Sequence, residues 1–309
     1  MQQNNVTVAP TFFLLGFQSS SRMFLFCLLL VAYFGTICGN LLIITLVSTS
    51  KILHTPMYFF ISHLSVSDIL LITDIVPNLL HILLSKGGAI TFIGCFTQFW
   101  FFGVVETFEC LLLAVMSYDR YVAICNPLRY PSIMTNGQCV KLVITSWLVS
   151  FSFTLIDALT ISVMTYCGPN VIDHIFCDLL PLIEIACSDT NIVRLEVYIL
   201  SFPVLFIPIT IIIISYINII ATIFRLQSRV SRQKAFSTCS SHLTVVSIFY
   251  FTIFGVYVFP TEGQILNMKK ILSLLYTVLT PLINPIIYSL RNKDIKTSLQ
   301  ERIKFFCHL

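Results

Sequence analysis

Seven long apolar stretches restrict what this chain can fold into. A helix needs about 20 apolar residues to cross a bilayer core of about 30 Å, and each stretch is long enough. They cover residues 23–47, 56–84, 92–124, 140–163, 195–224, 236–260 and 271–290. Only 10% of the 309 residues are charged, against about 25% in soluble domains, which excludes a soluble fold.

The apolar stretches predict an all-α membrane protein, a bundle of seven transmembrane helices. Continuous runs favour helices over a membrane β-barrel, whose strands alternate in hydropathy over about ten residues. We expect a single domain over residues 1–309: an N-terminal tail (1–22), the bundle (23–290), and a C-terminal tail with a short helix (291–309).

Lysine and arginine are divided unevenly between the two ends of the predicted bundle. Of the 18 basic residues, most fall on the end that carries the C-terminal tail, and the basic end of a membrane protein faces the cytoplasm. The N-terminus is therefore predicted to be extracellular and the C-terminal helix cytoplasmic. Asn5 begins an Asn-Val-Thr glycosylation acceptor, which agrees with this orientation.

Four of the 11 cysteines fall on the predicted extracellular side. Cys95 begins the third span, and Cys167, Cys177 and Cys187 share the long connection after the fourth. An even number of cysteines in an oxidising compartment indicates disulfides, and the residues alone leave three pairings open. No Cys/His spacing is typical of zinc, so we expect neither a metal nor a cofactor.

The third span carries charged residues within the predicted membrane core and also at its cytoplasmic end. Glu106 and Glu109 are three residues apart, share roughly one helix face, and should point into the bundle because a charge facing lipid is costly. Glu109 is deeper and could join Asp68 and Asn284 in a polar cluster, whereas a ligand could reach Glu106. For both glutamates, structural hydrogen bonding is the competing interpretation.

An Asp119–Arg120 pair closes the cytoplasmic end of the same span. One interpretation is an interfacial arginine that reaches toward the headgroups. The other is a conformational switch, because an arginine held by a neighbouring carboxylate can be released to other partners.

Several strings closely resemble the signatures of vertebrate odorant receptors, a family of rhodopsin-like G-protein-coupled receptors. Residues 116–125 (MSYDRYVAIC) differ from the family string MAYDRYVAIC by Ser117 alone. The resemblance covers nearly the whole chain, and the other matching strings follow in the family's order. They are Gly39-Asn40, residues 53–60 (LHTPMYFF), Leu64-Ser65 with Asp68, Ser215-Tyr216, residues 234–243 (KAFSTCSSHL) and residues 281–292 (PLINPIIYSLRN).

The resemblance implies a receptor in the plasma membrane that binds a small odorant in the outer half of the bundle. It also implies coupling to a stimulatory, olfactory-type G protein that raises cyclic AMP. The implied switch and coupling residues are Asp119, Arg120, Tyr121, Tyr216, Lys234, Asn284, Pro285 and Tyr288. Asn40, Asp68 and Glu109 form the implied polar core, and the implied disulfides are Cys95–Cys177 and Cys167–Cys187.

Helical spacing then gives a predicted ligand pocket. Its residues are Phe99, Phe102, Gly103, Glu106, Thr107, Val204, Phe251, Tyr257 and Thr277, each with helix packing as the competing interpretation. Phe251 stands where the family often has glycine, which predicts a smaller pocket. Glu106 does not match the family and is predicted to select ligands, either as a charged partner of an amine or as a neutral partner of carbonyl and hydroxyl groups.

Three alternative functions compete with the receptor. The buried carboxyls could serve an ion path in a transporter or channel, although no inverted repeat is visible. An intramembrane enzyme would need a motif such as His-Glu-x-x-His, which is absent from the sequence, so no enzymatic activity is expected. A receptor of this fold could also sense a metabolite outside the nose. Membrane lipid is an expected partner and nucleic acid is not.

Overall fold

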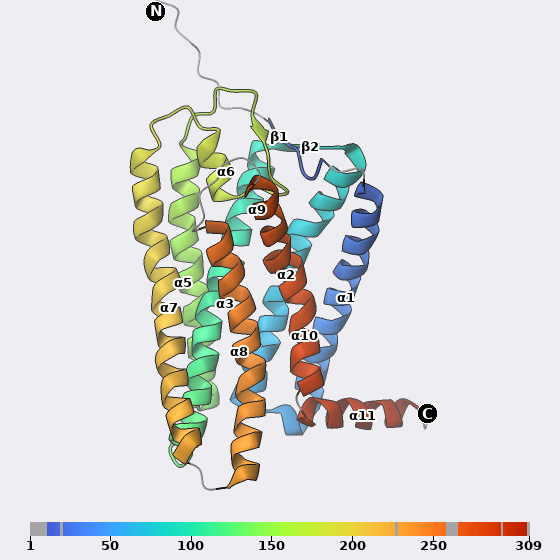
Figure 1. Ribbon diagram of the computed structural model, residues 1–309, viewed down its shortest axis with the longest axis vertical. Coiled ribbons are helices and arrows are strands. Elements are labelled where there is room, and N and C mark those ends of the chain that lie inside the picture. Colours follow the sequence, from blue (N-terminus) through green and yellow to red (C-terminus); the bar gives the residue numbers. More distant parts are fainter. Residues whose placement is uncertain (1–10, 19–20, 226–227, 258–264, 292, 308–309) are drawn as a thin grey trace, which may run out of the picture.

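The computed structural model describes residues 11–18, 21–225, 228–257, 265–291 and 293–307. Within these ranges seven helical segments are long and apolar enough to span a membrane (Figure 1), which confirms the predicted all-α fold. Six spans lie in single helices: α1 (Arg22–Thr49), α2 (Pro56–Ser85), α3 (Phe92–Cys125), α5 (Asn136–Ser162), α7 (Asn191–Arg225) and α8 (Arg229–Tyr257). The seventh runs through α9 (Ile265–Leu274), a π-helical turn (Leu275–Leu279) and α10 (Thr280–Arg291).

Local sequence signals explain where three spans begin. The hydroxyl of Thr91 accepts a hydrogen bond from the backbone N–H of Gly94 at the start of α3, and Thr135 accepts one from Gln138 at the start of α5. These are N-caps, which satisfy backbone donors that a helix leaves unpaired. Pro56 opens α2, where its missing N–H costs nothing.

The seventh span begins earlier than the predicted residue 271. Lys269 and Lys270, which hydropathy assigns to a connecting loop, lie in α9 and are 6% and 2% exposed. The ammonium of Lys270 donates to the backbone oxygen of Gly16 at 3.0 Å and forms an ion pair with Asp173. Because these partners satisfy its charge, this lysine can be buried in a helix that hydropathy alone would shorten.

The N-terminal segment and two loops form a small sheet that covers one end of the bundle, hereafter the loop end (Figure 1). β1 (Thr11–Leu14) pairs antiparallel with β2 (Gly88–Thr91) and parallel with β3 (Val171–Ile172). The sequence predicted only a tail here. The short helix α6 (Leu179–Glu184) lies beside the sheet. Disulfides join Cys95 to Cys177 and Cys167 to Cys187, so the structure contains the pairing that the resemblance implied.

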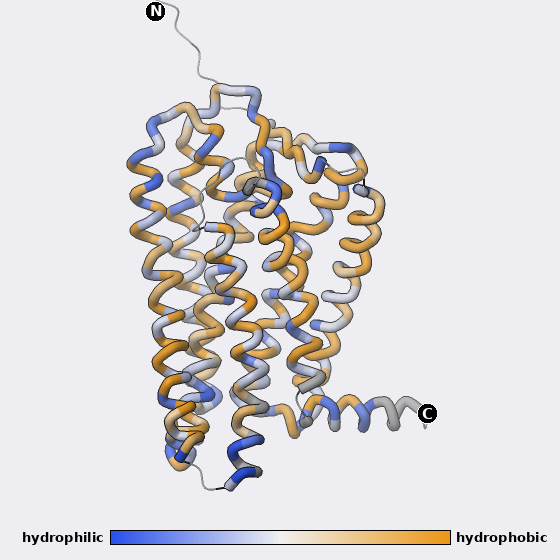
Figure 2. The backbone as a smooth tube through the Cα atoms, viewed as in Figure 1, coloured by the Kyte–Doolittle hydropathy of each residue, from blue (hydrophilic) through white to orange (hydrophobic). Residues whose placement is uncertain are grey.

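The opposite end, hereafter the C-terminal end, carries a 3₁₀ turn (Lys51–Leu53), α4 (Tyr130–Ile133) and α11 (Lys293–Cys307). α11 lies across the bundle rather than along it (Figure 1). α3 lies at the centre and contacts α2, α5, α7 and α8. Apolar residues cover much of the length of the helices (Figure 2), as expected for a surface that faces lipid.

Close packing of α1 against α10 depends on Gly39. A Cβ added at Gly39 would lie 3.0 Å from Cγ of Pro285, and the proline ring cannot rotate away. We expect Gly39→Val to lower the free energy of unfolding by about 1–3 kcal/mol through overpacking. Gly137→Val is the matched control, because a Cβ at Gly137 meets nothing within 4 Å. Equal melting temperatures of the two purified variants would contradict the prediction.

Candidate ligand-binding and switch sites

At the C-terminal end of the bundle, Arg120 is held by its neighbour on α3. Its guanidinium pairs with the buried carboxylate of Asp119, with Nε 2.9 Å from Oδ2. The hydroxyl of Tyr130 donates to the other carboxylate oxygen at 2.8 Å. Asp119 therefore holds Arg120 on one oxygen and ties α3 to α4 with the other. This is the neighbouring-carboxylate arrangement on which the switch prediction depends.

A second hydrogen bond links α7 to α8 at the same end. The hydroxyl of Tyr216 lies 2.7 Å from Nδ1 of His242, and both side chains are buried. Tyr288 is also buried, and its hydroxyl has no hydrogen-bond partner within the described ranges. Tyr121 is half-buried and packs against Tyr118. Lys234 lies on α8.

The predicted polar core lies midway along the bundle. The amide of Asn284 donates to both carboxylate oxygens of Asp68, at 3.0 and 3.1 Å. Glu109 is buried nearby, close enough to Asp68 for their carboxyls to interact electrostatically. Asn40 donates instead to the backbone oxygen of Pro281 at 3.1 Å, so it ties α1 to α10 just before Pro285.

Glu106 lies one turn nearer the loop end than Glu109. It is half-buried, whereas Val104, Val105 and Thr107 around it are buried. Its carboxyl interacts electrostatically with Asp178 of the loop. Because α3 is the central helix, a half-buried side chain on its inner face indicates that Glu106 borders a space inside the bundle.

Aromatic side chains lie near Glu106, because the hydroxyls of Tyr257 and Tyr276 interact electrostatically with its carboxyl. Phe102 packs against Phe176 and Tyr276, with ring centroids 5.1 and 5.9 Å apart. Tyr257 of α8 approaches from the other side and is half-buried. Such apolar walls with a few polar groups are typical of small-molecule sites.

The other predicted pocket residues are placed as follows. Phe99 is buried in a cluster with Cys95 and Cys177 at the loop end, and Val204 is half-buried on α7. Gly103 faces Thr154 of α5, where an added Cβ would lie 3.3 Å from Cγ2. Thr107 and Thr277 are buried, and the Thr277 hydroxyl donates to the Ser273 backbone oxygen.

The prediction that Phe251 lines the pocket is wrong. Its side chain is 74% exposed, while Tyr250, Thr252 and Ile253 beside it are buried. The ring therefore points out of the bundle, toward the surface that lipid would cover. Helical spacing could not show this, because it fixes which residues share a face but not how the helix is rotated. A ring in this position does not fill space inside the bundle, so the hypothesis that Phe251 makes the pocket smaller is not supported.

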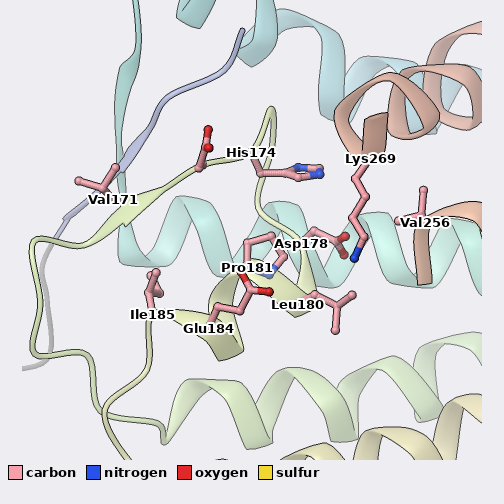
Figure 3. A pocket seen from close by; sticks show the side chains of 10 residues that line it. Val171, His174, Asp178, Leu180, Pro181, Glu184, Ile185, Val256 and Lys269 are labelled. Carbon is pink, nitrogen blue, oxygen red and sulfur yellow. The ribbon is translucent and has the colours of Figure 1, made fainter. Parts of the chain in front are cut away.

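Sequence reasoning missed a cavity of about 150 Å³ under the loop, next to α8 and α9 (Figure 3). Its lining residues are Val171, Asp173, His174, Asp178, Leu180, Pro181, Glu184, Ile185, Val256 and Lys269. Asp178 accepts hydrogen bonds from the Leu179 backbone N–H at 2.7 Å and from the Tyr257 hydroxyl at 3.2 Å. The sequence did contain one signal for Asp178: it directly follows Cys177, and the disulfide from Cys177 to Cys95 holds this part of the loop next to α3.

Burial shifts two titratable groups in this loop in opposite directions. It raises the pKa of Asp178 to about 6, although hydrogen bonds from Leu179 and Tyr257 and the charge of Lys269 favour the carboxylate. Burial, together with the neighbouring charge of Lys270, lowers the pKa of His174 to about 4. His174 is therefore neutral and Asp178 mostly ionised at neutral pH.

The buried histidine predicts a loss of stability in acid. The folded-state pKa of His174 lies below the ordinary value of 6.5, so its contribution is present above that value and is lost as pH falls toward 4. Between pH 7 and 5 the loss is about 2 kcal/mol, at 1.36 kcal/mol per pKa unit. We expect His174→Gln to reduce the fall in melting temperature over this range.

Asp178 serves as a control, because its contribution to stability changes with pH in the opposite direction to that of His174. Its raised pKa favours the protonated folded state, so its contribution is lost as pH rises through about 6. Asp178→Asn should therefore steepen the fall in melting temperature between pH 7 and 5. A variant His174→Gln that melts with the wild-type pH dependence would contradict this account.

A bundle of seven spans, with a cavity near one end and an arginine paired with its neighbouring carboxylate at the other, is typical of the seven-helix class of membrane receptors. The sequence comparisons make the family specific. The family model for "Olfactory receptor" matches residues 26–306. The chain belongs to the olfactory receptor family, and it is a G-protein-coupled receptor and not an enzyme.

Individual relatives agree with the family model. The chain is 44% identical to human olfactory receptor 11L1, over 99% of this chain and 96% of the relative. It is 46% identical to human olfactory receptor 11H4, over 97% and 93%. Identity to mouse olfactory receptor 5G9 is 44%, over 97% and 96%. The chain therefore spans nearly the full length of each.

Proposed function

We propose that this receptor binds a small odorant in the half of the bundle next to the loop end and then activates a stimulatory, olfactory-type G protein, which raises cyclic AMP. Family membership supports the receptor class. The geometry of α3 is the observation that supports the coupling, since this helix carries Glu106 beside the internal space and Arg120 at the C-terminal end. The helical rise separates these two residues by about 21 Å.

The same proposal assigns the orientation. The loop end carries both disulfides, and disulfides persist in oxidising compartments, so this end is extracellular. The basic residues near the C-terminal end support a cytoplasmic location for α11. Asn5, the proposed glycosylation acceptor, lies outside the described residues. The receptor then resides in the plasma membrane as a multi-pass protein.

Activation is a shift between two states. The hydrogen bonds Arg120–Asp119, Tyr130–Asp119 and Tyr216–His242 stabilise the arrangement in the structure. A ligand shifts the equilibrium only by its difference in affinity for the two states. An odorant that binds better when α8 has moved away from α3 and α7 would break the Tyr216–His242 bond and free Arg120 for the G protein.

The proposal is tested with a cyclic AMP reporter in cells that express the receptor at the surface. The panel spans amines, acids, alcohols, aldehydes and esters, and a parallel assay follows uptake of each compound. We expect at least one compound to raise cyclic AMP without being transported. Ligand or ion flux without cyclic AMP would support the transporter alternative and overturn the proposal.

A further inference from the structure

The carboxyl of Glu106 lacks a hydrogen-bond partner among the residues that the structure describes. A carboxyl in the middle of a membrane bundle is costly unless a donor or a positive charge compensates it. Two acidic neighbours, Asp178 and Glu109, interact with it electrostatically. The hydroxyls of Tyr257 and Tyr276 do so as well, but neither donates a hydrogen bond to it in the described part of the chain. The bundle therefore presents an acceptor whose donor has to come from elsewhere.

Asp178 brings a second carboxyl to the same region. Its side chain lines the 150 Å³ cavity under the loop (Figure 3) and interacts electrostatically with Glu106 of α3. In a region of low dielectric constant, two carboxyls that interact in this way disfavour ionisation of both, unless a cation lies between them. Lys269 lines the cavity too, and its charge interacts with Asp178 and Glu184.

Two further polar groups at this place are unsatisfied. The hydroxyl of Tyr276, only 2% exposed, makes no hydrogen bond of normal geometry in the described part of the chain, although Tyr257 and Ser273 lie near it. It interacts electrostatically with both carboxyls. Nδ1 of His174, which lines the cavity and is 3% exposed, is likewise unpaired there. Buried polar groups are rarely left unpaired, and this cluster can form hydrogen bonds with a small polar ligand.

The geometry points to a small primary amine as the ligand, with its ammonium bound between Glu106 and Asp178. This inference rests on the proposed odorant-binding function and names the ligand class. An ammonium has three donors, enough for the two carboxyls and the oxygen of Tyr276. Its positive charge removes the repulsion between the carboxylates. Val256, which lines the cavity and belongs to the same apolar cluster as Phe102, offers apolar contact for a short alkyl chain, and the cavity volume limits its length.

The test is the melting temperature of the purified receptor with n-pentylamine or 1-pentanol over one concentration series. The two probes match in length and differ in the ammonium. A ligand that binds only the folded state raises the melting temperature. We expect n-pentylamine to do so with at least tenfold higher apparent affinity than 1-pentanol. Glu106→Gln and Asp178→Asn should each weaken amine binding at least tenfold.

These substitutions keep the shape of the side chains. In Asp178→Asn, the amide oxygen can still accept the hydrogen bonds from Leu179 and Tyr257. Asp189→Asn is the matched control, because it removes an exposed negative charge at the loop end outside the cavity, and its amide oxygen can still accept the hydrogen bond from the Asn191 backbone N–H. We expect it to change amine affinity by less than threefold. A loss equal to that of Glu106→Gln would show general attraction of cations instead of a site.

Other outcomes overturn the inference outright. Equal affinity for the amine and the alcohol, or unchanged amine binding in Glu106→Gln, would show that the carboxyl does not bind an ammonium. The melting assay needs no G protein, so it separates this inference from the proposed function. An amine that stabilises the receptor without raising cyclic AMP contradicts the proposed activation by this ligand. If only neutral odorants raise cyclic AMP, the inferred amine site is contradicted and the proposed receptor function is not.

Discussion

Arg120→Ala is expected to abolish the odorant-dependent rise in cyclic AMP, with a maximal response at least ~tenfold below that of the wild type. In the structure the guanidinium is bound to Asp119, and in the proposed activation it is released when the C-terminal end opens. Alanine has no group that could then contact the G protein. The measurement is the cyclic AMP response to an active compound from the panel, in cells sorted for equal surface level.

Arg129→Ala is the control for this experiment. Arg129 is exposed, lies just before α4 at the same end, and makes its hydrogen bonds in the structure through its backbone. Its substitution removes the same charge from the same end of the bundle, and we expect a response within threefold of the wild type. A normal response from Arg120→Ala at matched surface level would contradict the switch assigned to this residue.

The sequence predicted the number and approximate limits of the spans because apolar length is a local property of the chain. The third stretch, predicted at residues 92–124, became α3 from Phe92 to Cys125. The prediction for the seventh was wrong at its start because Lys269 and Lys270 resemble loop residues. The burial of Lys270 depends on partners such as Gly16, which is 254 residues away in the chain, and hydropathy does not register such contacts.

The candidate site was predicted in part. Glu106, Phe102 and Tyr257 lie on inward faces of their helices, as helical spacing and the intramembrane charge predict, and their role in ligand binding stays a prediction. Phe251 was misplaced because spacing does not give the rotation of α8. Asp178 and His174 were missed for a different reason: they lie on an irregular loop, whose path over the bundle is set by the Cys95–Cys177 bond and by pairing of β3 with β1.

Removal of the Cys95–Cys177 disulfide is also expected to have a large effect. Cys95 and Cys177 are 82 residues apart, and closing a loop of this length restricts the unfolded chain by about 4–5 kcal/mol. The bond also fixes Asp178, the next residue, close to α3. We expect the double variant Cys95→Ser/Cys177→Ser to lose most of its surface expression and its response to any ligand.

The second disulfide provides the internal comparison. Cys167 and Cys187 are 20 residues apart, so the same relation gives about 3 kcal/mol, and this bond stays within the loop instead of joining it to α3. The double variant Cys167→Ser/Cys187→Ser should therefore retain more surface receptor, measured by labelling of intact cells, and more ligand binding. Because serine replaces both members of each pair, neither variant gains an unpaired cysteine from the broken bond.

Equal losses from both double variants would show that neither loop length nor attachment to α3 decides the effect. If the variant without the Cys95–Cys177 bond instead loses more ligand binding per surface receptor, the difference is due to the position of the loop over the ligand site.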